Sequence, residues 1–417
     1  AVDHNQLTME IMKKVADKHD LVCLLHEKPF EGINGSGKHN NWSMITDDGV
    51  NLLDPGKTPS ENIQFLVFLM AVIKAVDEYA DLLRISVASA GNDHRLGANE
   101  APPAVVSIFL GDELTEVLKS IENDTYFTSH GAVQMDIGAT VLPHFVKDNT
   151  DRNRTSPFAF TGNKFEFRML GSAASVANPN IVLNTAVAEA LDQFAKELDG
   201  VAPEDMEHAV HELIKRAIKK HKRVIFNGNG YTDEWIEEAK KRGLYNLKST
   251  PDALPMWIAQ KNIDLFTKHS IFTSEELHSR YEIWLENYSK TINIESNTMV
   301  EMVQKDLLPS VMSYIEEIAS TASLKASVVP GITCESETAL ITKLSELQDA
   351  MTKGLEKLKS DTAKARATED VLENAKLYQA EVLEDMEELR KSADAAETLI
   401  PDDLLPYPTY GKLLFYI

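Results

Sequence analysis

Residues 151–168 read DRNRTSPFAFTGNKFEFR, a stretch in which aromatic and charged side chains stand close together. Phe165 and Phe167 flank Glu166, and this alternation is typical of a strand that buries one of its faces. Other short alternating segments occur between residues 136 and 168. The sequence therefore predicts strands of a mixed or antiparallel sheet in this part of the chain.

The same stretch carries a cluster of cations, namely Arg152, Arg154, Lys164 and Arg168, in a chain whose formal net charge is -23. Glu166 and Arg168 are two residues apart on the predicted strand, so their side chains face the same side. Arginine binds phosphate or carboxylate through two parallel hydrogen bonds, which lysine cannot imitate. The cluster is either part of a ligand site or a structural network of ion pairs, and composition alone does not decide between the two.

The composition excludes several classes of protein. The chain has 417 residues, with 42 Lys and Arg against 65 Asp and Glu, and 43% of its residues are hydrophobic. This length predicts two or three domains with large cores, and the acidic balance argues against nucleic-acid binding. Two distant cysteines, Cys23 and Cys334, predict neither a disulfide framework nor a structural zinc site. This cysteine usage favours a reducing cytosol as the location. Because no apolar run is as long as a membrane helix, we expect a protein that binds no membrane.

Several segments of the first hundred residues have recognisable patterns. Gln6–Lys18 predicts an amphipathic helix, and Leu21–Leu25 predicts a short buried strand. Asp47–Gly49 is a turn signal. Residues 59–83 are apolar around much of a helical circumference and predict one long buried helix. Ser86–Glu100 is polar and lacks a period, so it is expected to be irregular.

The chain is predicted to be mostly helical from Ala186 onward, and its last third has a stripe of apolar residues. The residues that recur there at steps of three and four are Leu340, Leu344, Leu347, Met351, Leu355 and Leu358, then Leu372, Ala375, Val382, Met386, Leu389 and Ala393. Over about residues 337–397 this stripe predicts a coiled-coil-like helix or an antiparallel helix pair. Its expected use is packing or assembly.

Gly32–His39 reads GINGSGKH and satisfies the GxxxxGK part of a phosphate-binding loop, but His39 stands where such a loop requires Ser or Thr. A P-loop also opens directly into a helix, whereas Asn40–Ser43 leads toward the predicted turn. The match is therefore interpreted as misleading. His39 and Glu166 are both potential ligands of a hard divalent ion.

His208 and His211 have helical spacing and suggest a shared metal ion. In the HExxH motif, however, the second histidine follows the first by four residues, and Lys215 occupies that position. The pair is interpreted as part of a solvated helix face.

Three segments together resemble the glutamine synthetase family, and in detail its type III branch. They are KPFEGINGSGKHNNWS at Lys28–Ser43, HRLGANEAP at His94–Pro102, and NRTSPFAFTGNKFEFR followed by ANP at Asn153–Pro179. The resemblance implies an α+β fold. Residues 1–290 are expected to form the C-terminal part of a catalytic domain with a curved, mainly antiparallel sheet and flanking helices, and residues 291–417 a helical extension.

The resemblance also implies a reaction, the ATP-dependent ligation of ammonia to glutamate. The γ-carboxylate would attack the terminal phosphoryl group of ATP, giving ADP and γ-glutamyl phosphate. Ammonia would then displace phosphate to give glutamine. The family uses ATP with Mg²⁺ or Mn²⁺, and the resemblance implies a homo-oligomer, a dodecamer of two stacked hexameric rings.

The matched motifs imply a role for each of their polar residues: metal binding by His39 and Glu166, amino-acid substrate binding by Asn34, Gly35, Arg95 and Arg168, nucleotide contacts by Asn41, Ser43, Arg154 and Lys164, and catalysis by Glu100 and Arg154. Glu100 is expected on a flap that closes over the acyl phosphate, and Arg154 at the transferred phosphate. Cations and a closing flap suit phosphoryl transfer, which needs charge neutralisation and the exclusion of water.

The sequence also departs from the family. Many members have a further arginine where this chain has Phe158–Phe160, and Lys164 stands where arginine is common, so phosphate contacts are expected from Arg152 or Lys164. The family draws its other metal-binding glutamates, and an aspartate supplied across a subunit interface, from sequence upstream of Ala1. We therefore expect this chain to be the C-terminal portion of a larger polypeptide and to be inactive alone.

Two other functions remain as alternatives. A non-catalytic relative would keep the fold as an assembly scaffold, although a scaffold has no need for matched phosphate and metal groups. A ligase with the same chemistry would instead use an organic amine. The sequence of Lys28–Ser43 favours ammonia, and the character of the nucleophile pocket, acidic for ammonium or wide and apolar for a larger amine, would discriminate the two.

Overall fold

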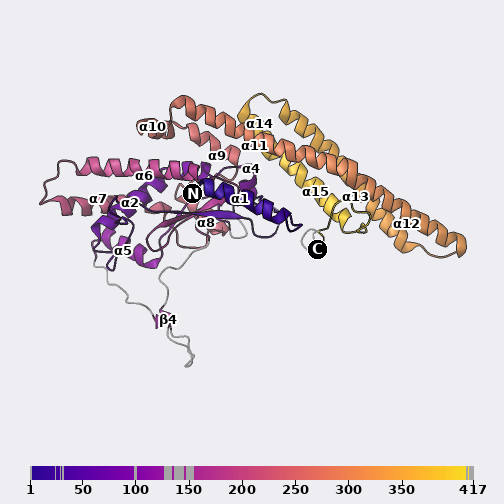
Figure 1. Cartoon of the computed structure of the whole chain (residues 1–417), viewed down its shortest axis with the longest axis horizontal. Coiled ribbons are helices and arrows are strands. Elements are labelled where there is room, and N and C mark those ends of the chain that lie inside the picture. The colour runs from indigo at the N-terminus through magenta and orange to yellow at the C-terminus, as the bar shows by residue number, and fades with distance from the viewer. Residues whose placement is uncertain are drawn as a thin grey trace. The chain divides into compact units, whose positions relative to one another are not determined.

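The computed structural model describes residues 2–23, 25–28, 30, 32–97, 101–125, 134–135, 145–146, 155–409 and 412. These residues form two compact units. The first unit comprises Leu24–Tyr281 with the first two residues, and the second comprises Asp3–Cys23 and Glu282–Ile417. Figure 1 traces both along the chain, and each unit is described by itself.

A four-stranded sheet lies at the centre of the first unit. Its strands, in spatial order, are β1 (Gly37–Trp42), β6 (Phe165–Gly171), β5 (Phe158–Phe160) and β2 (Ile108–Phe109). β6 is antiparallel to both β1 and β5, whereas β2 is parallel to β5. The strand predicted around Glu166 is therefore confirmed, and the sheet is mixed. A separate antiparallel pair consists of β3 (Gln134–Met135) and β4 (Phe145–Val146).

One face of the sheet is aromatic and buried. The rings of Phe158 and Phe165 stack with their centroids 4.7 Å apart, and Phe167 meets Phe158 at 6.0 Å. Phe160 lies 5.9 Å from Phe65 of α2 (Ile63–Glu78), so this face packs against that helix. Because side chains alternate across a strand, Glu166 and Arg168 belong to the opposite face.

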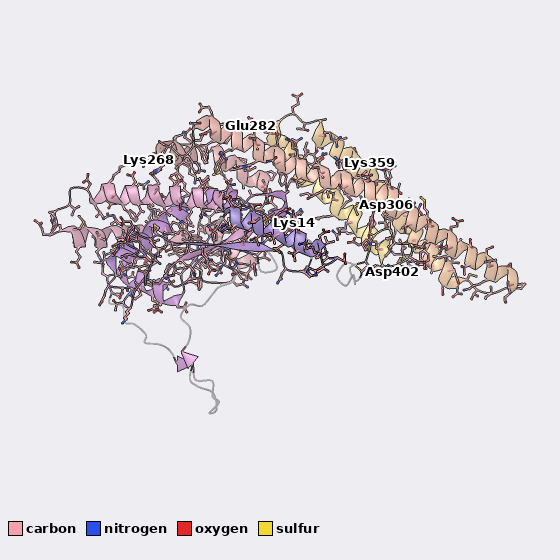
Figure 2. The ribbon with its side chains drawn as sticks, in the orientation of Figure 1. Lys14, Lys268, Glu282, Asp306, Lys359 and Asp402 are labelled. Atoms are coloured by element: carbon pink, nitrogen blue, oxygen red, sulfur yellow. The ribbon has the colours of Figure 1, made fainter. Side chains whose placement is uncertain are left out.

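Helices surround the sheet and carry most of the first unit. Besides α2, they are α3 (Ala80–Ile85), α4 (Ala90–Arg95), α5 (Asp112–Glu122), α6 (Ala177–Leu198), α7 (Met206–His221), α8 (Asp233–Lys241), α9 (Thr250–Ala253) and α10 (Gln260–Lys268), with 3₁₀ turns at Lys222–Val224 and Leu254–Ile258. α2 packs against α6 and α7. Figure 2 shows Lys268 at the end of α10, where its Nζ binds Glu189 of α6 at 2.6 Å and Asp192 at 2.8 Å.

Three predictions for the first hundred residues are corrected. The helix expected over residues 59–83 begins at Ile63, because the Asn62 side chain accepts the Phe65 N–H at 3.0 Å and caps it, and it is interrupted at Tyr79. The polar stretch after Ser86 contains the short helix α4. The described residues of Leu21–Leu25 form no strand, since they have no sheet partner and Val22 is 72% exposed.

The second unit consists of long helices. They are α1 (Val2–Asp17), the part of α11 (Ser274–Met302) after Tyr281, α12 (Leu308–Val328), α13 (Glu335–Arg366), α14 (Val371–Leu377) and α15 (Leu383–Glu397), with π-helical turns at Val303–Leu307 and Tyr378–Val382. The predicted amphipathic helix is thus confirmed as α1, although Leu7 and Ile11 on its apolar stripe are exposed in the described structure. Across the described residues, no helix combines the length and apolar character needed to span a bilayer.

The apolar stripe of the last third forms the seam between α13 and α15, which lie side by side in Figure 1. Lys357 pairs with Asp385 and Lys364 pairs with Glu381, so residue numbers rise along one helix as they fall along the other. The prediction of an antiparallel pair is confirmed. The buried members of the stripe include Leu344, Leu347, Met351, Leu355 and Leu358 on α13 and Leu389 and Ala393 on α15.

Candidate functional site

The polar face of the sheet brings His39, Glu166 and Arg168 together. Lys38 pairs with Leu170, but Asn40 already pairs with Phe167, so β6 has one more residue than β1 at this point. This bulge places Arg168 and Met169 opposite His39. The His39 Nδ1 atom then lies 3.6 Å from Oε2 of Glu166.

Glu166 is the centre of this group. The Nε and Nη2 atoms of Arg168 donate to its Oε2 at 3.2 and 3.1 Å, and the Thr161 hydroxyl donates to its Oε1 at 3.3 Å. Burial by itself would raise the pKa of Glu166, but the hydrogen bonds and charge of Arg168, with His39 and Thr161, outweigh it and lower the pKa below its ordinary value. The carboxylate is therefore held ionised, and the shared face predicted for Glu166 and Arg168 is confirmed.

The His39 and Glu166 pair fits two neighbouring positions around one divalent ion. Two ligands about 2.1 Å from an octahedral ion lie about 3 Å apart, close to the observed separation. The side chain of His39 is 58% exposed and that of Glu166 is 12% exposed, so the pair can be reached from solvent. Within the described ranges, no group of three or more His, Cys, Asp and Glu side chains could hold a metal. The other ligands of such an ion would come from phosphate, water or residues beyond those described.

The opposite side of β1 is fixed by α6. The Asn40 side chain donates to Oδ1 of Asn180 at 2.8 Å, and the Trp42 indole donates to Oδ1 of Asn184 at 2.8 Å. These two asparagines stand one helical turn apart, so they present two acceptors to one strand. Sequence reasoning missed both of them, although Asn180 directly follows the ANP segment.

Three predicted nucleotide contacts lie near this end of the sheet. Asn41 is exposed and pairs in register with Glu166. The Ser43 hydroxyl donates to Oδ1 of Asn51 at 2.7 Å and to the Asn163 carbonyl at 3.1 Å. Lys164 is half-buried, next to Asn163 in the turn between β5 and β6. The structure thus gathers these residues on one edge, and their contact with a nucleotide stays a prediction.

Arg95, a predicted substrate ligand, is 5% exposed, and its side chain donates hydrogen bonds to other residues of the chain. Its guanidinium donates to the carbonyls of Met169 at 3.2 Å and Arg168 at 3.3 Å, and to Oδ1 of Asn92 at 3.3 Å. Burial lowers the pKa of Arg95, while the negative charge of Glu27 opposes this. In this structure Arg95 therefore ties α4 to the bulged part of β6.

Glu27 is a second feature that sequence reasoning missed. It is 7% exposed, and its Oε1 accepts the Ala173 N–H at 3.0 Å. A Cβ atom on Gly91 would lie 2.6 Å from its Oε2, and one on Gly35 would lie 2.6 Å from its main-chain oxygen. Glycine at these places lets the chain approach the buried carboxylate closely. Asn34, beside Gly35, is exposed.

Three predicted positions fall outside the described residues. They are Glu100, expected on the flap, Arg154, expected at the phosphate, and Arg152, the alternative phosphate contact. Their roles stay predictions.

Two misleading motifs are explained by the structure. Lys38 and His39 lie within strand β1, so the GxxxxGK segment does not open into a helix and cannot act as a P-loop. His208 and His211 lie on α7, and the Nε2 atom of His211 is 3.9 Å from Oδ1 of Asp124. Both histidines are exposed, as expected of a solvated helix face.

Two parts of the chain match domains of one known protein family. Residues 1–106 match the glutamine synthetase catalytic domain, and residues 209–325 match the glutamine synthetase C-terminal domain. A glutamine synthetase of Butyrivibrio fibrisolvens is 57% identical over the whole of this chain. The chain belongs to the glutamine synthetase family.

Other glutamine synthetases are similar over the same extent. The type-3 glutamine synthetase of Dictyostelium discoideum is 46% identical, and a glutamine synthetase of Bacteroides fragilis is 38% identical, each over 100% of this chain. The chain spans 57% to 59% of the length of these three relatives. Membership of the glutamine synthetase family and the small mixed sheet with many helices confirm the predicted α+β class.

Proposed function

We propose that this chain supplies part of the active site of a glutamate-ammonia ligase that forms glutamine, ADP and phosphate. The observation that carries the proposal is the group of His39, Glu166 and Arg168 on the polar face of the sheet. It combines an ionised carboxylate, an arginine that donates two hydrogen bonds to it, and an imidazole nitrogen 3.6 Å from it. Phosphoryl transfer needs such groups to position reactants and to neutralise charge.

The proposed reaction has two steps. An oxygen of the glutamate γ-carboxylate attacks the terminal phosphorus of ATP, and the bond to ADP breaks. The nitrogen of ammonia then attacks the γ-carbonyl carbon, phosphate leaves with the bonding pair, and the nitrogen loses a proton. The γ-glutamyl phosphate between the steps is labile in water, so the site must exclude solvent.

The polar residues of the matched motifs each have a proposed part in this scheme. His39 and Glu166 would hold Mg²⁺ or Mn²⁺, which, when bound, neutralises charge on the nucleotide phosphates. The remaining proposed roles are binding of the amino-acid substrate by Asn34, Gly35, Arg95 and Arg168, contact with ATP by Asn41, Ser43 and Lys164, phosphate binding and catalysis by Arg154, and closure over the acyl phosphate by Glu100. Arg95 would have to exchange main-chain acceptors for a substrate carboxylate, or act on the substrate by shaping β6.

The segments and the number of subunits that activity needs are also proposed. Because the chain spans less than two thirds of its relatives, we infer that activity needs further segments and that these 417 residues alone are inactive. The proposed domains are residues 1–290, for catalysis, and 291–417, a helical extension. By family resemblance, the active form is a homo-oligomer of two stacked hexameric rings.

A mutational test uses the native polypeptide that contains this chain. ADP release is measured with ATP, glutamate and Mg²⁺, with and without ammonium. We expect ammonium-dependent release to fall on the order of 100-fold or more in His39→Ala and Glu166→Ala, because a metal contributes several kcal/mol of charge stabilisation. His208→Ala, an exposed histidine on α7, is the matched control and should retain full activity. Unchanged turnover in both site variants would remove the proposed metal site.

A further inference from the structure

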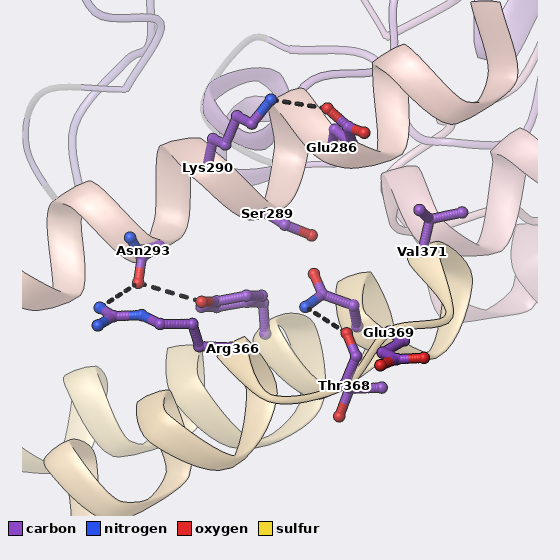
Figure 3. A pocket seen from close by; sticks show the side chains of 10 residues that line it. Glu286, Ser289, Lys290, Asn293, Arg366, Thr368, Glu369 and Val371 are labelled. Atoms are coloured by element: carbon purple, nitrogen blue, oxygen red, sulfur yellow. Dashed lines mark hydrogen bonds and ion pairs between the residues drawn. The ribbon is translucent and has the colours of Figure 1, made fainter. Parts of the chain in front are cut away.

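The second unit contains a small hollow far along the chain from the sheet residues. It lies between α11 and the turn from α13 to α14, and its volume is about 250 Å³. Figure 3 shows side chains from both sides converging on it. Those that matter here are Ser289 and Asn293 on α11, and Arg366, Glu369, Asn374 and Tyr378 on the other side. Pockets for drug-sized ligands start at about 300 Å³, so this hollow suits a smaller molecule.

A buried hydroxyl lacks a partner at the inner wall of the hollow. Ser289 is 7% exposed, and its Oγ has no hydrogen-bond partner among the described residues. In Figure 3 this hydroxyl points from α11 toward the turn. A buried polar group without a partner destabilises a fold, so such groups are rare unless something else binds them.

At the other end of the hollow, the Asn293 side chain accepts two hydrogen bonds. Its Oδ1 accepts from Nη2 of Arg366 at 3.0 Å and from the Tyr378 hydroxyl at 3.1 Å, as the dashed lines in Figure 3 show. These two donors fix the orientation of the amide and hold the arginine at the hollow. Tyr378 begins the π-helical turn Tyr378–Val382, and π turns within helices are frequent at functional sites.

Some charged side chains at the hollow form an ion pair and others do not. Lys290 and Glu286 at its edge pair with each other at 2.7 Å. Arg366 and Glu369 are both exposed, and in the described part of the chain no carboxylate pairs with Arg366, which donates to Oδ1 of Asn293 and of Asn297, and no cation pairs with Glu369. Both belong to the side of the hollow that faces α11, and Figure 3 places them toward different ends of it. One cation and one anion without a counter-ion, at the two ends of a small hollow, match a ligand that carries both charges.

We propose that this hollow binds a small zwitterion, a free α-amino acid. Its carboxylate would pair with the Arg366 guanidinium and its ammonium with Glu369, while Ser289 and Asn374 would meet the polar part of its side chain. The proposal is independent of the catalytic site and of the reaction proposed for it.

The test is local hydrogen exchange in the native polypeptide, which distinguishes this hollow from any other amino-acid site. Proteinogenic amino acids are added one at a time, and exchange is followed by mass spectrometry. At least one is expected to slow exchange at least threefold in residues 286–293 and 366–378. Acetate and methylammonium, which each carry one of the two charges, are expected to have little effect there.

Variants link the protection to the proposed contacts. Arg366→Ala should weaken binding at least tenfold, Arg366→Lys should weaken it less, and Ser289→Ala should weaken it about fivefold. Ser289→Ala should not lower the melting temperature of the ligand-free protein, because it removes a hydroxyl that has no partner. Arg390→Ala on α15 is the control and should bind normally. The proposal is overturned if no amino acid protects these segments, if Arg366→Ala binds as the wild type does, or if acetate alone protects them equally.

Discussion

Glu166 is both a proposed metal ligand and the counter-charge of the buried Arg168. The residue is 9% exposed, yet Arg168, His39 and Thr161 lie close enough to its carboxylate to keep it charged. A buried ion pair contributes little net stability, but removing one member leaves the other charge uncompensated. Arg168 is itself 3% exposed, so the loss of Glu166 would leave a buried guanidinium without this counter-charge.

The first prediction follows from the lowered pKa of Glu166. Its contribution to stability is complete above pH 4.5, the ordinary value, and is lost as the pH falls through the lower value of the folded state. Glu166→Gln should therefore destabilise the chain most near pH 7, and its difference from the wild type should shrink below about pH 4.5. Urea unfolding of both proteins between pH 3 and pH 7 measures this. A difference that stays constant over that range would contradict the account.

The second prediction concerns Gly37 and Arg95. A Cβ atom on Gly37 would collide with the guanidinium of Arg95, which holds α4 against β6. Gly37→Ala should lower the free energy of unfolding by about 1 to 3 kcal/mol, as overpacking commonly does. The cost should be smaller when Arg95 is already alanine, because the colliding group is gone. Equal costs in the two backgrounds would show that the collision is not the cause.

At the scale of elements, the site depends on how β1 is held. α6 fixes one side of the strand through Asn180 and Asn184, while the bulge in β6 sets the position of His39 on the other. A substitution on α6 that removes one of these contacts is therefore expected to change the position of β1 and of His39.

The third prediction tests this clamp. Asn180→Ala removes the acceptor for Asn40 and should cost about 1 kcal/mol of unfolding free energy, with faster amide exchange along β1. Lys196→Ala, on the exposed side of α6, is the control and should change stability by less than about 0.5 kcal/mol, because it removes a solvent-exposed ion pair with Asp192. If exchange in β1 is the same in both variants, α6 does not hold the strand.

Local patterns predicted some elements well and others poorly. The alternation around Glu166 and the leucine steps around Met351 each report a periodic buried face, and periodicity is visible in sequence. The break at Tyr79, by contrast, interrupts an apolar run that has no Gly or Pro at that point. Leu21–Leu25 looked like a strand because it is apolar, but a strand also needs a partner. The burial of Arg95 depends on a bulge in a distant strand, which no local pattern reveals.

At the scale of the whole molecule, the chain combines a sheet-based unit and a helical unit. The helical unit owes its core to the seam of α13 and α15, where Met351 and Leu344 are fully buried. The family matches include residues of both units, because they cover residues 1–106 and 209–325.

The fourth prediction tests the seam. Met351→Ala should destabilise the helical unit by about 2 to 5 kcal/mol, because it removes a fully buried side chain and leaves a cavity. Lys353→Ala, two residues along and exposed, should have little effect. Amide exchange within residues 335–397 reports this unit directly. Equal exchange in the two variants would mean that the stripe is not a packing surface.

The measurement that tests the central proposal most directly is the stoichiometry of the reaction in the native polypeptide. ADP and glutamine are quantified together with ATP, glutamate, Mg²⁺ and ammonium, and again with an organic amine in place of ammonium. A ligase that uses ammonia should form one glutamine for each ADP and should require ammonium. ADP formation only with the organic amine would show a different acceptor, and no ADP under either condition would contradict the assignment of a ligase.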